Sequence, residues 1–171
     1  MDQDPIEVAT DHPCILAVLT RRLAASRDVD VASLAGEALE AMLKDDRFDS
    51  CCAPRYFALA PDKSEREIQI PIATQGDVAT RVLVWPVGSR DLPHPHVDGW
   101  TVFVPVNGGL TSVSRSGDAA VVVAALEPRR PKVLRAEAGV VHRVRNQAGV
   151  PAMSIHVSGS QLRSPFVKSH A

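Results

Sequence analysis

The sequence predicts an all-β fold, an antiparallel sandwich or jelly roll, with two helices packed on its outside. From residue 56 onward, short β-rich runs alternate with turn residues, a pattern typical of these folds. Before residue 50, two stretches carry apolar residues at helical spacing instead. With 171 residues, the chain is long enough for one domain with a substantial core.

Two amphipathic helices are expected near the start of the chain, over residues 11 to 26 and 31 to 44. Asp11 and Asp30 are good N-caps for them, and Pro13 falls in the first turn of the first helix. Their apolar stripes consist of Ile15, Leu16, Leu19 and Leu23 in the first helix, and of Leu34, Ala38, Leu39, Met42 and Leu43 in the second. We expect both helices to pack against the outside of a barrel; a partner-binding helix hairpin is the alternative.

The strands are expected to be short and to end at residues that favour turns. They are predicted at residues 56–60, 67–73, 81–87, 100–106, 111–115, 120–126, 132–135, 142–146 and 153–158. Breaks such as Gly76-Asp77 and Gly117-Asp118 separate them. We therefore expect an N-terminal helical appendage over residues 1–50, a β-barrel over 51–160, and an irregular tail over 161–171 that covers one end of the barrel.

The composition is that of an ordinary globular protein, with 45% apolar and 23% charged residues. A net charge of −1 argues against nucleic acid or an anionic membrane as partner. No apolar run is long enough to span a membrane, and the start of the chain lacks the basic residues of a signal peptide. Cys14, Cys51 and Cys52 fit neither a zinc site nor a disulfide framework. We expect reduced thiols in a cytoplasmic monomer or homodimer.

Three histidines are the candidate metal ligands. His94 and His96 lie one residue apart, and Pro93 and Pro95 favour an extended backbone around them. Alternate side chains of a strand point the same way, so both imidazoles can reach one ion. His142 on a neighbouring strand would complete a face of three nitrogen ligands and leave other positions open for reactants. The alternative is that all three are ordinary surface or core histidines.

The sequence around these histidines resembles the paired motifs of the cupin superfamily. The first motif runs from Gly88 to His96 (GSRDLPHPH) and the second from Gly139 to Asn146 (GVVHRVRN). The segments 85–88, 106–111 and 151–156 are similar to the cysteine dioxygenase (thiol dioxygenase) branch, so the resemblance covers roughly residues 74 to 160. It implies a cupin jelly-roll barrel, with iron(II) bound by His94, His96 and His142.

The resemblance also bears on the charge of the metal site. Many cupins place a glutamate five residues after the second histidine, where this chain has Thr101, and residues 99 to 107 contain no Asp or Glu. Three neutral imidazoles leave the charge of a divalent ion uncompensated, which favours an anionic ligand such as a thiolate. Asp98, two residues after His96, is a rival ligand or base. Imidazole suits several metals, so nickel, manganese and zinc remain open besides iron.

Ser154 and His156 are the candidate catalytic residues beside the metal. They alternate on one expected strand and resemble the first two members of the Ser-x-His-x-Tyr relay of thiol dioxygenases, whereas Ser158 replaces the tyrosine. The one tyrosine of the chain is Tyr56. Thr101 also stands where some members have the cysteine that crosslinks to that tyrosine, so this crosslink cannot form. A core histidine without a catalytic role is the alternative for His156.

The resemblance also concerns the residue that holds the substrate carboxylate. Members that oxidise cysteine use an arginine whose position falls here near Ile70 or Ile72. The substitutes close by in sequence are Arg81, our first candidate, and Arg55, Arg66 and Arg143. Any of them could form a bidentate pair of hydrogen bonds with a carboxylate.

These observations predict a non-haem iron(II) oxygenase that uses dioxygen to oxidise cysteine or a cysteine-like thiol, most simply to a sulfinic acid. One alternative is oxidative cleavage of a thiol amino acid. Another is a metal-binding or sensing protein without turnover.

Overall fold

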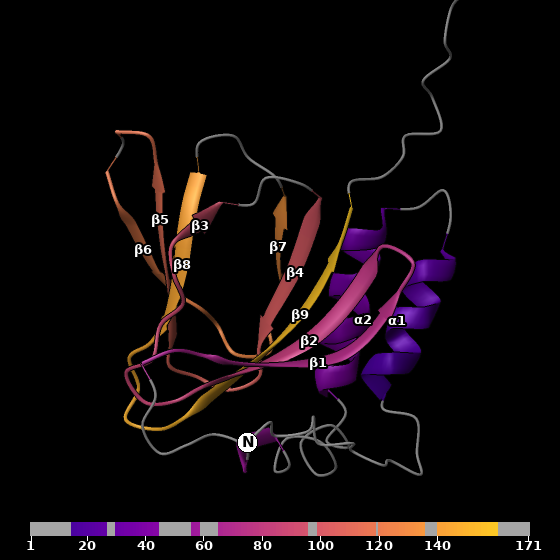
Figure 1. Cartoon of the computed structure of the whole chain (residues 1–171), viewed down its shortest axis with the longest axis horizontal. Coiled ribbons are helices and arrows are strands. Elements are labelled where there is room, and N and C mark those ends of the chain that lie inside the picture. The colour runs from indigo at the N-terminus through magenta and orange to yellow at the C-terminus, as the bar shows by residue number, and fades with distance from the viewer. Residues whose placement is uncertain are drawn as a thin grey trace, which may run out of the picture.

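The β-strands form two antiparallel sheets, and two helices lie on the outside of the larger one (Figure 1). The computed structural model describes residues 15–26, 30–44, 56–58, 65–95, 99–118, 120–135 and 140–160. The elements are α1 (Ile15–Ala25), α2 (Val31–Lys44), β1 (Ile68–Gln75), β2 (Val78–Trp85), β3 (His94–Pro95), β4 (Trp100–Pro105), β5 (Leu110–Ser116), β6 (Val122–Ala125), β7 (Lys132–Arg135), β8 (Val140–Asn146) and β9 (Ala152–Gly159).

The strand order identifies the fold as a jelly roll. The larger sheet has the order β1-β2-β9-β4-β7, and the smaller has the order β3-β8-β5-β6. Strands β2 to β9 therefore pair from the outside inward, β2 with β9, β3 with β8, β4 with β7 and β5 with β6. This is one long hairpin wound into a barrel, the jelly-roll architecture that cupins share. The predicted fold class is confirmed.

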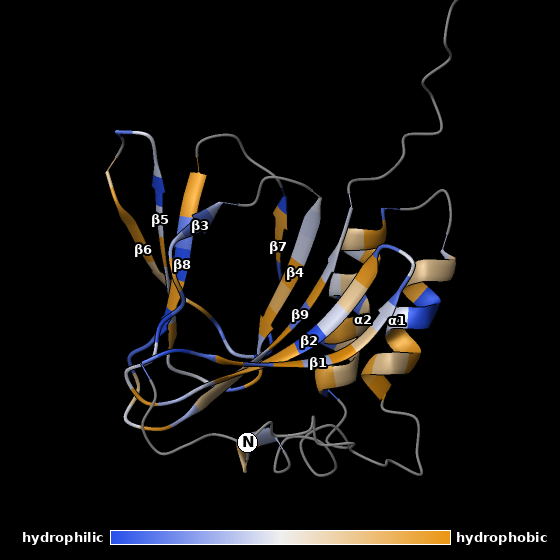
Figure 2. Ribbon diagram, viewed as in Figure 1, coloured by the Kyte–Doolittle hydropathy of each residue, from blue (hydrophilic) through white to orange (hydrophobic). Residues whose placement is uncertain are grey.

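The helices cover the outer face of the larger sheet. Helix α1 packs on β1 and β2, and α2 packs on β4, β7 and β9. Leu16, Leu23 and Leu39 from the helices are fully or almost fully buried against strand residues such as Val82 and Ile155. Figure 2 shows the apolar sides of both helices turned toward the sheet. The prediction of two helices packed outside the barrel is confirmed.

A second apolar core lies inside the barrel. Alternation along the strands separates the two cores, because Val82 faces the helices whereas Leu83 faces the interior. The interior cluster consists of Leu83, Trp85, Phe103, Leu110, Leu126, Val144 and Ala152. These side chains from both sheets hold the sheets together.

Asp30 caps α2 and connects it to the larger sheet. Its carboxylate accepts hydrogen bonds from the backbone N–H of Ser33 at 3.3 Å and from the Ser33 hydroxyl at 2.9 Å. Arg135 at the end of β7 donates to the same carboxylate at 2.6 Å. The hydrogen bonds from Ser33 and the charge of Arg135 lower the pKa of Asp30. The predicted N-cap is thus present, whereas Asp11 and Pro13 lie outside the described residues.

Most predicted strands are present with ends shifted by a few residues, but the strand predicted at 56–60 is wrong. Tyr56 and Phe57 are helical and Ala58 is in a turn, while residues 59–60 are outside the described ranges. Both aromatic side chains pack against the core between helices and sheet. Consecutive residues of a strand would face opposite sides, whereas a helical turn lets both reach one core.

Two further expectations concern the chain as a whole. The proposed boundaries after residues 50 and 160 adjoin undescribed residues and stay predictions. Within the described ranges, no helix has the length and apolar character needed to cross a membrane.

We predict that Asp30→Ala lowers the free energy of unfolding by about 1 kcal/mol at neutral pH, the usual effect of losing an N-cap. Asp30→Asn should lose less, because asparagine also caps helices and the half-exposed pair with Arg135 adds little. Because folding lowers the pKa of Asp30, its charge stabilises the fold above pH about 4 and this contribution is lost in acid. Urea unfolding at pH 7 and at lower pH measures both effects. Equal stability of wild type and Asp30→Ala at pH 7 would contradict the assignment.

Candidate active site

A cavity of about 50 Å³ lies between the two sheets. The larger sheet contributes Arg81, Thr101, Phe103, Lys132, Leu134 and His156, and the other lining residues are Asp91, His94, Ser112, Leu126, His142 and Val144. Polar and titratable side chains therefore converge here from both sheets. The cavity adjoins the apolar interior cluster, since Phe103, Leu126 and Val144 belong to both.

His94 and His142 lie side by side on the smaller sheet. They are direct partners in the ladder between β3 and β8, so their side chains leave the sheet on the same face. Their Nε2 atoms are 2.9 Å apart, and the rings meet edge to face with centroids 4.5 Å apart. Residues 48 positions apart in sequence thus form one pair of imidazoles at the cavity.

The geometry of this pair fits two ligands of one metal ion. Two nitrogens that each lie about 2.1 Å from an ion, at a right angle, are about 3 Å from each other. The Nδ1 atom of His94 lies 2.8 Å from the carbonyl oxygen of Leu92. When Nδ1–H donates to this carbonyl, Nε2 keeps its lone pair for a metal, the arrangement typical of ligating histidines.

The third predicted ligand, His96, lies outside the described residues, as does its rival Asp98. Among the residues that are described, no three His, Cys, Asp or Glu side chains are grouped to hold a metal. The assignment of His94, His96 and His142 as a set therefore stays a prediction, for which two members have suitable geometry.

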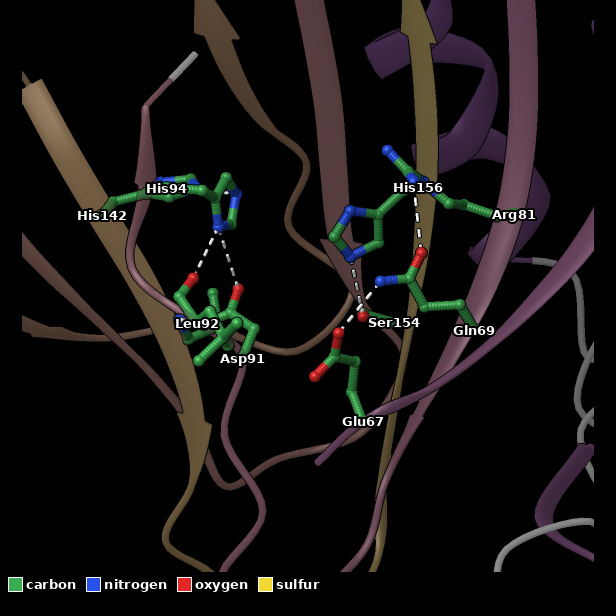
Figure 3. Close-up of polar contacts among 10 residues, drawn as sticks. Glu67, Gln69, Arg81, Asp91, Leu92, His94, His142, Ser154 and His156 are labelled. Carbon is green, nitrogen blue, oxygen red and sulfur yellow. Dashed lines mark hydrogen bonds and ion pairs between the residues drawn. The ribbon is translucent and has the colours of Figure 1, made fainter. Parts of the chain in front are cut away.

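Asp91 lies next to His94, below it in the view of Figure 3. Its Oδ2 atom lies 3.6 Å from Nδ1 of His94, and its Oδ1 atom accepts a hydrogen bond of 2.6 Å from the backbone N–H of Val144. The carboxylate thereby connects the segment before β3 to β8. Burial raises the pKa of Asp91 to about 6. Sequence analysis missed this residue, although it lies three positions before His94.

Ser154 and His156 face the cavity side from the larger sheet. The Ser154 hydroxyl lies 3.0 Å from Nε2 of His156 and accepts a hydrogen bond of 2.8 Å from the indole N–H of Trp85. The His156 ring also packs edge to face on Phe103. Trp85 and Phe103 thus fix the pair in place, a part of the site that sequence analysis did not identify. The contact expected between Ser154 and His156 is present, whereas their catalytic role stays a proposal.

A chain of polar side chains leads away from His156 along β2 and β1 (Figure 3). Arg81 is the ladder partner of His156 and donates a hydrogen bond of 3.2 Å to Gln69. Gln69 in turn donates one of 2.9 Å to Glu67. The Oε2 atom of Glu67 is buried and has no hydrogen-bond partner among the described residues. Arg81 therefore lines the cavity in a defined orientation.

None of the other arginine candidates is among the described residues that line the cavity. Arg66 is exposed and does not line it, and Arg55 lies outside the described ranges. Arg143 follows His142 on β8 and is absent from the cavity lining. The resemblance puts the arginine of the cysteine-oxidising members near Ile70 or Ile72, and here both side chains pack against the core under the helices.

The direction of Ile70 and Ile72 follows from the pairing of β1 with β2. The ladder pairs Pro71 with Arg81, a cavity-lining residue, so alternation places Gln69 and Pro71 on the interior side. Strand β1 therefore presents Gln69, and not an isoleucine, toward Arg81.

Thr101 on β4 and Ser158 on β9 are direct partners in the ladder between these strands. These are the two places at which the resemblance would put a crosslinked cysteine and tyrosine. Tyr56 does not compensate for the loss, because it packs against the core between the helices and the sheet.

Comparisons with known proteins found no matching family model and no matching curated protein. The solved structures that resemble this chain include a protein of Thermus thermophilus, with 24% identity, a TM-score of 0.47, and 61% of this chain and 93% of that chain covered. A cupin domain from Bordetella pertussis has 18% identity and a TM-score of 0.47, covering 57% of this chain and 97% of its own. An oxalate oxidase in complex with the substrate analogue glycolate has 12% identity and a TM-score of 0.48, covering 62% and 61%.

We predict that His142→Ala abolishes metal retention, because it removes one of two imidazoles whose nitrogens are 2.9 Å apart. Metal content after anaerobic loading with iron(II) and desalting, measured by plasma emission spectrometry, provides the test. His156→Ala is the matched control, since it deletes an imidazole from the opposite sheet. Full metal occupancy in His142→Ala would refute the assignment.

Proposed function

We propose that this protein is an iron(II)-dependent oxygenase that converts a small thiol to its sulfinic acid. The observation that carries the proposal is the convergence of the Nε2 atoms of His94 and His142 at a cavity that Arg81 and His156 also line. The resemblance of both histidine motifs to thiol dioxygenases supplies the reaction class.

The reaction balances without a further reactant. Both atoms of dioxygen are transferred to the sulfur of the thiol, which supplies four electrons as it becomes a sulfinic acid. No external reductant is needed. An iron(II) ion held by His94, His142 and the predicted ligand His96 would supply the redox chemistry that allows dioxygen to react with a thiolate.

Neighbouring groups orient the His94 ring so that its Nε2 atom can bind a metal. Leu92 and Asp91 both face Nδ1 of His94 and so fix the orientation of its ring. The neutral imidazoles leave the charge of the ion to be balanced by an anionic ligand. A substrate thiolate meets this requirement.

Ser154 and His156 orient the substrate from the opposite sheet. Since Trp85 donates to the Ser154 oxygen, the serine hydrogen is available for Nε2 of His156. In that arrangement the neutral ring carries its proton on Nδ1. The apolar side chains of Phe103, Leu126 and Val144 limit the water that enters the cavity.

Arg81 is our candidate for binding a substrate carboxylate. Its guanidinium can donate to a carboxylate while Gln69 holds the side chain in the cavity wall. Without the tyrosine that Ser158 replaces, an amino acid substrate has fewer partners at this end of the site. We therefore expect cysteine to be handled poorly or differently.

Oxygen uptake with a panel of thiols, combined with the mass of the product, tests the proposal. A sulfinic acid contains both oxygen atoms and keeps its carbon skeleton, whereas oxidative cleavage would produce fragments. No oxygen uptake with any thiol by the iron-loaded protein would favour a sensing function and overturn the proposal.

We predict that His156→Ala lowers turnover at least about tenfold while the iron content stays within error of wild type, since a group behind the reactants orients them without binding the metal. Steady-state oxygen uptake, normalised to measured iron, tests this. Parallel loss of iron and activity would show that His156 is instead structural or a ligand.

We also predict that Arg81→Ala raises the KM for cysteine, homocysteine and 3-mercaptopropionate by about tenfold or more, and leaves cysteamine nearly unchanged. Losing one charge-assisted hydrogen bond costs about 1.5–3 kcal/mol, which corresponds to about ten- to hundredfold in affinity. Rapid and tightly coupled oxidation of cysteine by wild type and variant alike would contradict both this role and the expected weakness of cysteine as a substrate.

A further inference from the structure

A row of interior side chains crosses the larger sheet from edge to edge. The ladders place Pro71 beside Arg81, Arg81 beside His156, His156 beside Phe103, and Phe103 beside Lys132. Arg81 and Lys132 are three strand spacings apart, or about 14 Å between their backbones. The cavity therefore has a cation on each side of His156, and sequence analysis identified only one of them.

Lys132 also lines a groove that shares part of its wall with the cavity. This groove, of about 300 Å³, includes Lys132, Leu134, Ser112 and His142 in its wall, and the same four residues line the cavity. Lys132 and His142 come from different sheets. Both side chains therefore line the two hollows from opposite sheets.

Lys132 differs from Arg81 in its side-chain contacts. The ammonium group of Lys132 makes no hydrogen bond or ion pair with any other described residue. Arg81, by contrast, donates to Gln69. The carboxylate that lines the cavity, Asp91, lies beside His94 and accepts a hydrogen bond from the backbone of Val144. Within the described part of the chain, the ammonium group of Lys132 is thus a cation at the cavity that no carboxylate neutralises.

We propose that Lys132 joins Arg81 in binding the acidic group of the substrate, since both line the cavity, and that the site consequently selects thiols that carry an anionic group. The proposal rests on the proposed function for the identity of the reacting group. With the acidic group at Lys132, the thiol of a short substrate points across the cavity toward His94 and His142. A neutral thiol of similar length lacks this attachment.

Thiol binding, measured by calorimetry without oxygen, tests the proposal independently of turnover. The probes are 3-mercaptopropionate and neutral 2-mercaptoethanol, added to protein as purified and after loading with iron(II). We expect Lys132→Met to weaken 3-mercaptopropionate binding about ten- to hundredfold, and to change 2-mercaptoethanol binding less than about twofold. Lys132→Arg should retain most of the affinity. Lys44→Met is the matched control, because Lys44 is an exposed lysine on α2 that pairs with Glu40.

Several outcomes would overturn the proposal. These are wild-type affinity for 3-mercaptopropionate in Lys132→Met, equal weakening of both thiols, or no measurable binding of 3-mercaptopropionate to wild type. A strong loss in Arg81→Met with none in Lys132→Met would assign the acidic group to Arg81 alone. Oxygen uptake by the wild type reports on the proposed function separately. Lys132-dependent binding without any oxygen uptake would contradict the proposed function alone.

Discussion

The candidate site depends on the register between β3 and β8. These strands are far apart in the chain, and their antiparallel pairing places His94 opposite His142. A shift by one residue would turn one imidazole to the other face of the sheet and separate the two nitrogens. Asp91 reinforces this register, because its carboxylate bonds the Val144 backbone on β8 while lying beside His94. Orientation of the histidines and pairing of the strands are therefore stabilised by the same contacts.

The jelly roll separates the stabilising parts of the protein from the reactive ones. Outward residues of the larger sheet pack under α1 and α2, and inward residues near Trp85 form the apolar interior cluster. Polar side chains can therefore line the rest of the barrel interior, and the packing of the two apolar cores stays intact. Trp85 connects the two regions, because its ring belongs to the interior cluster while its N–H donates to Ser154. This arrangement explains how a small barrel can hold several titratable groups around one cavity.

Local patterns predicted much of this structure. The Asp30 cap, most of the apolar stripes of the helices and the alternation of Ser154 with His156 are properties of neighbouring residues, and each is present. Two stripe predictions are wrong, because Ile15 and Leu34 are exposed. The helical turn at Tyr56 was missed because packing against the core decides its conformation. The roles of Asp91 and Lys132 were missed for a different reason. They depend on which distant strands lie side by side, and the spacing of residues along one strand does not encode that register.

The same limit applies at β1. The sequence alone does not set which face of this strand points inward, whereas the pairing of Pro71 with Arg81 turns Ile70 and Ile72 toward the helices. The measurement that tests the central claim most directly is a crystal structure of iron-loaded protein with anomalous scattering recorded at the iron edge. We expect one anomalous peak at the cavity, about 2.0–2.3 Å from Nε2 of both His94 and His142. A peak elsewhere, or full iron occupancy with either imidazole turned away from the ion, would contradict the account.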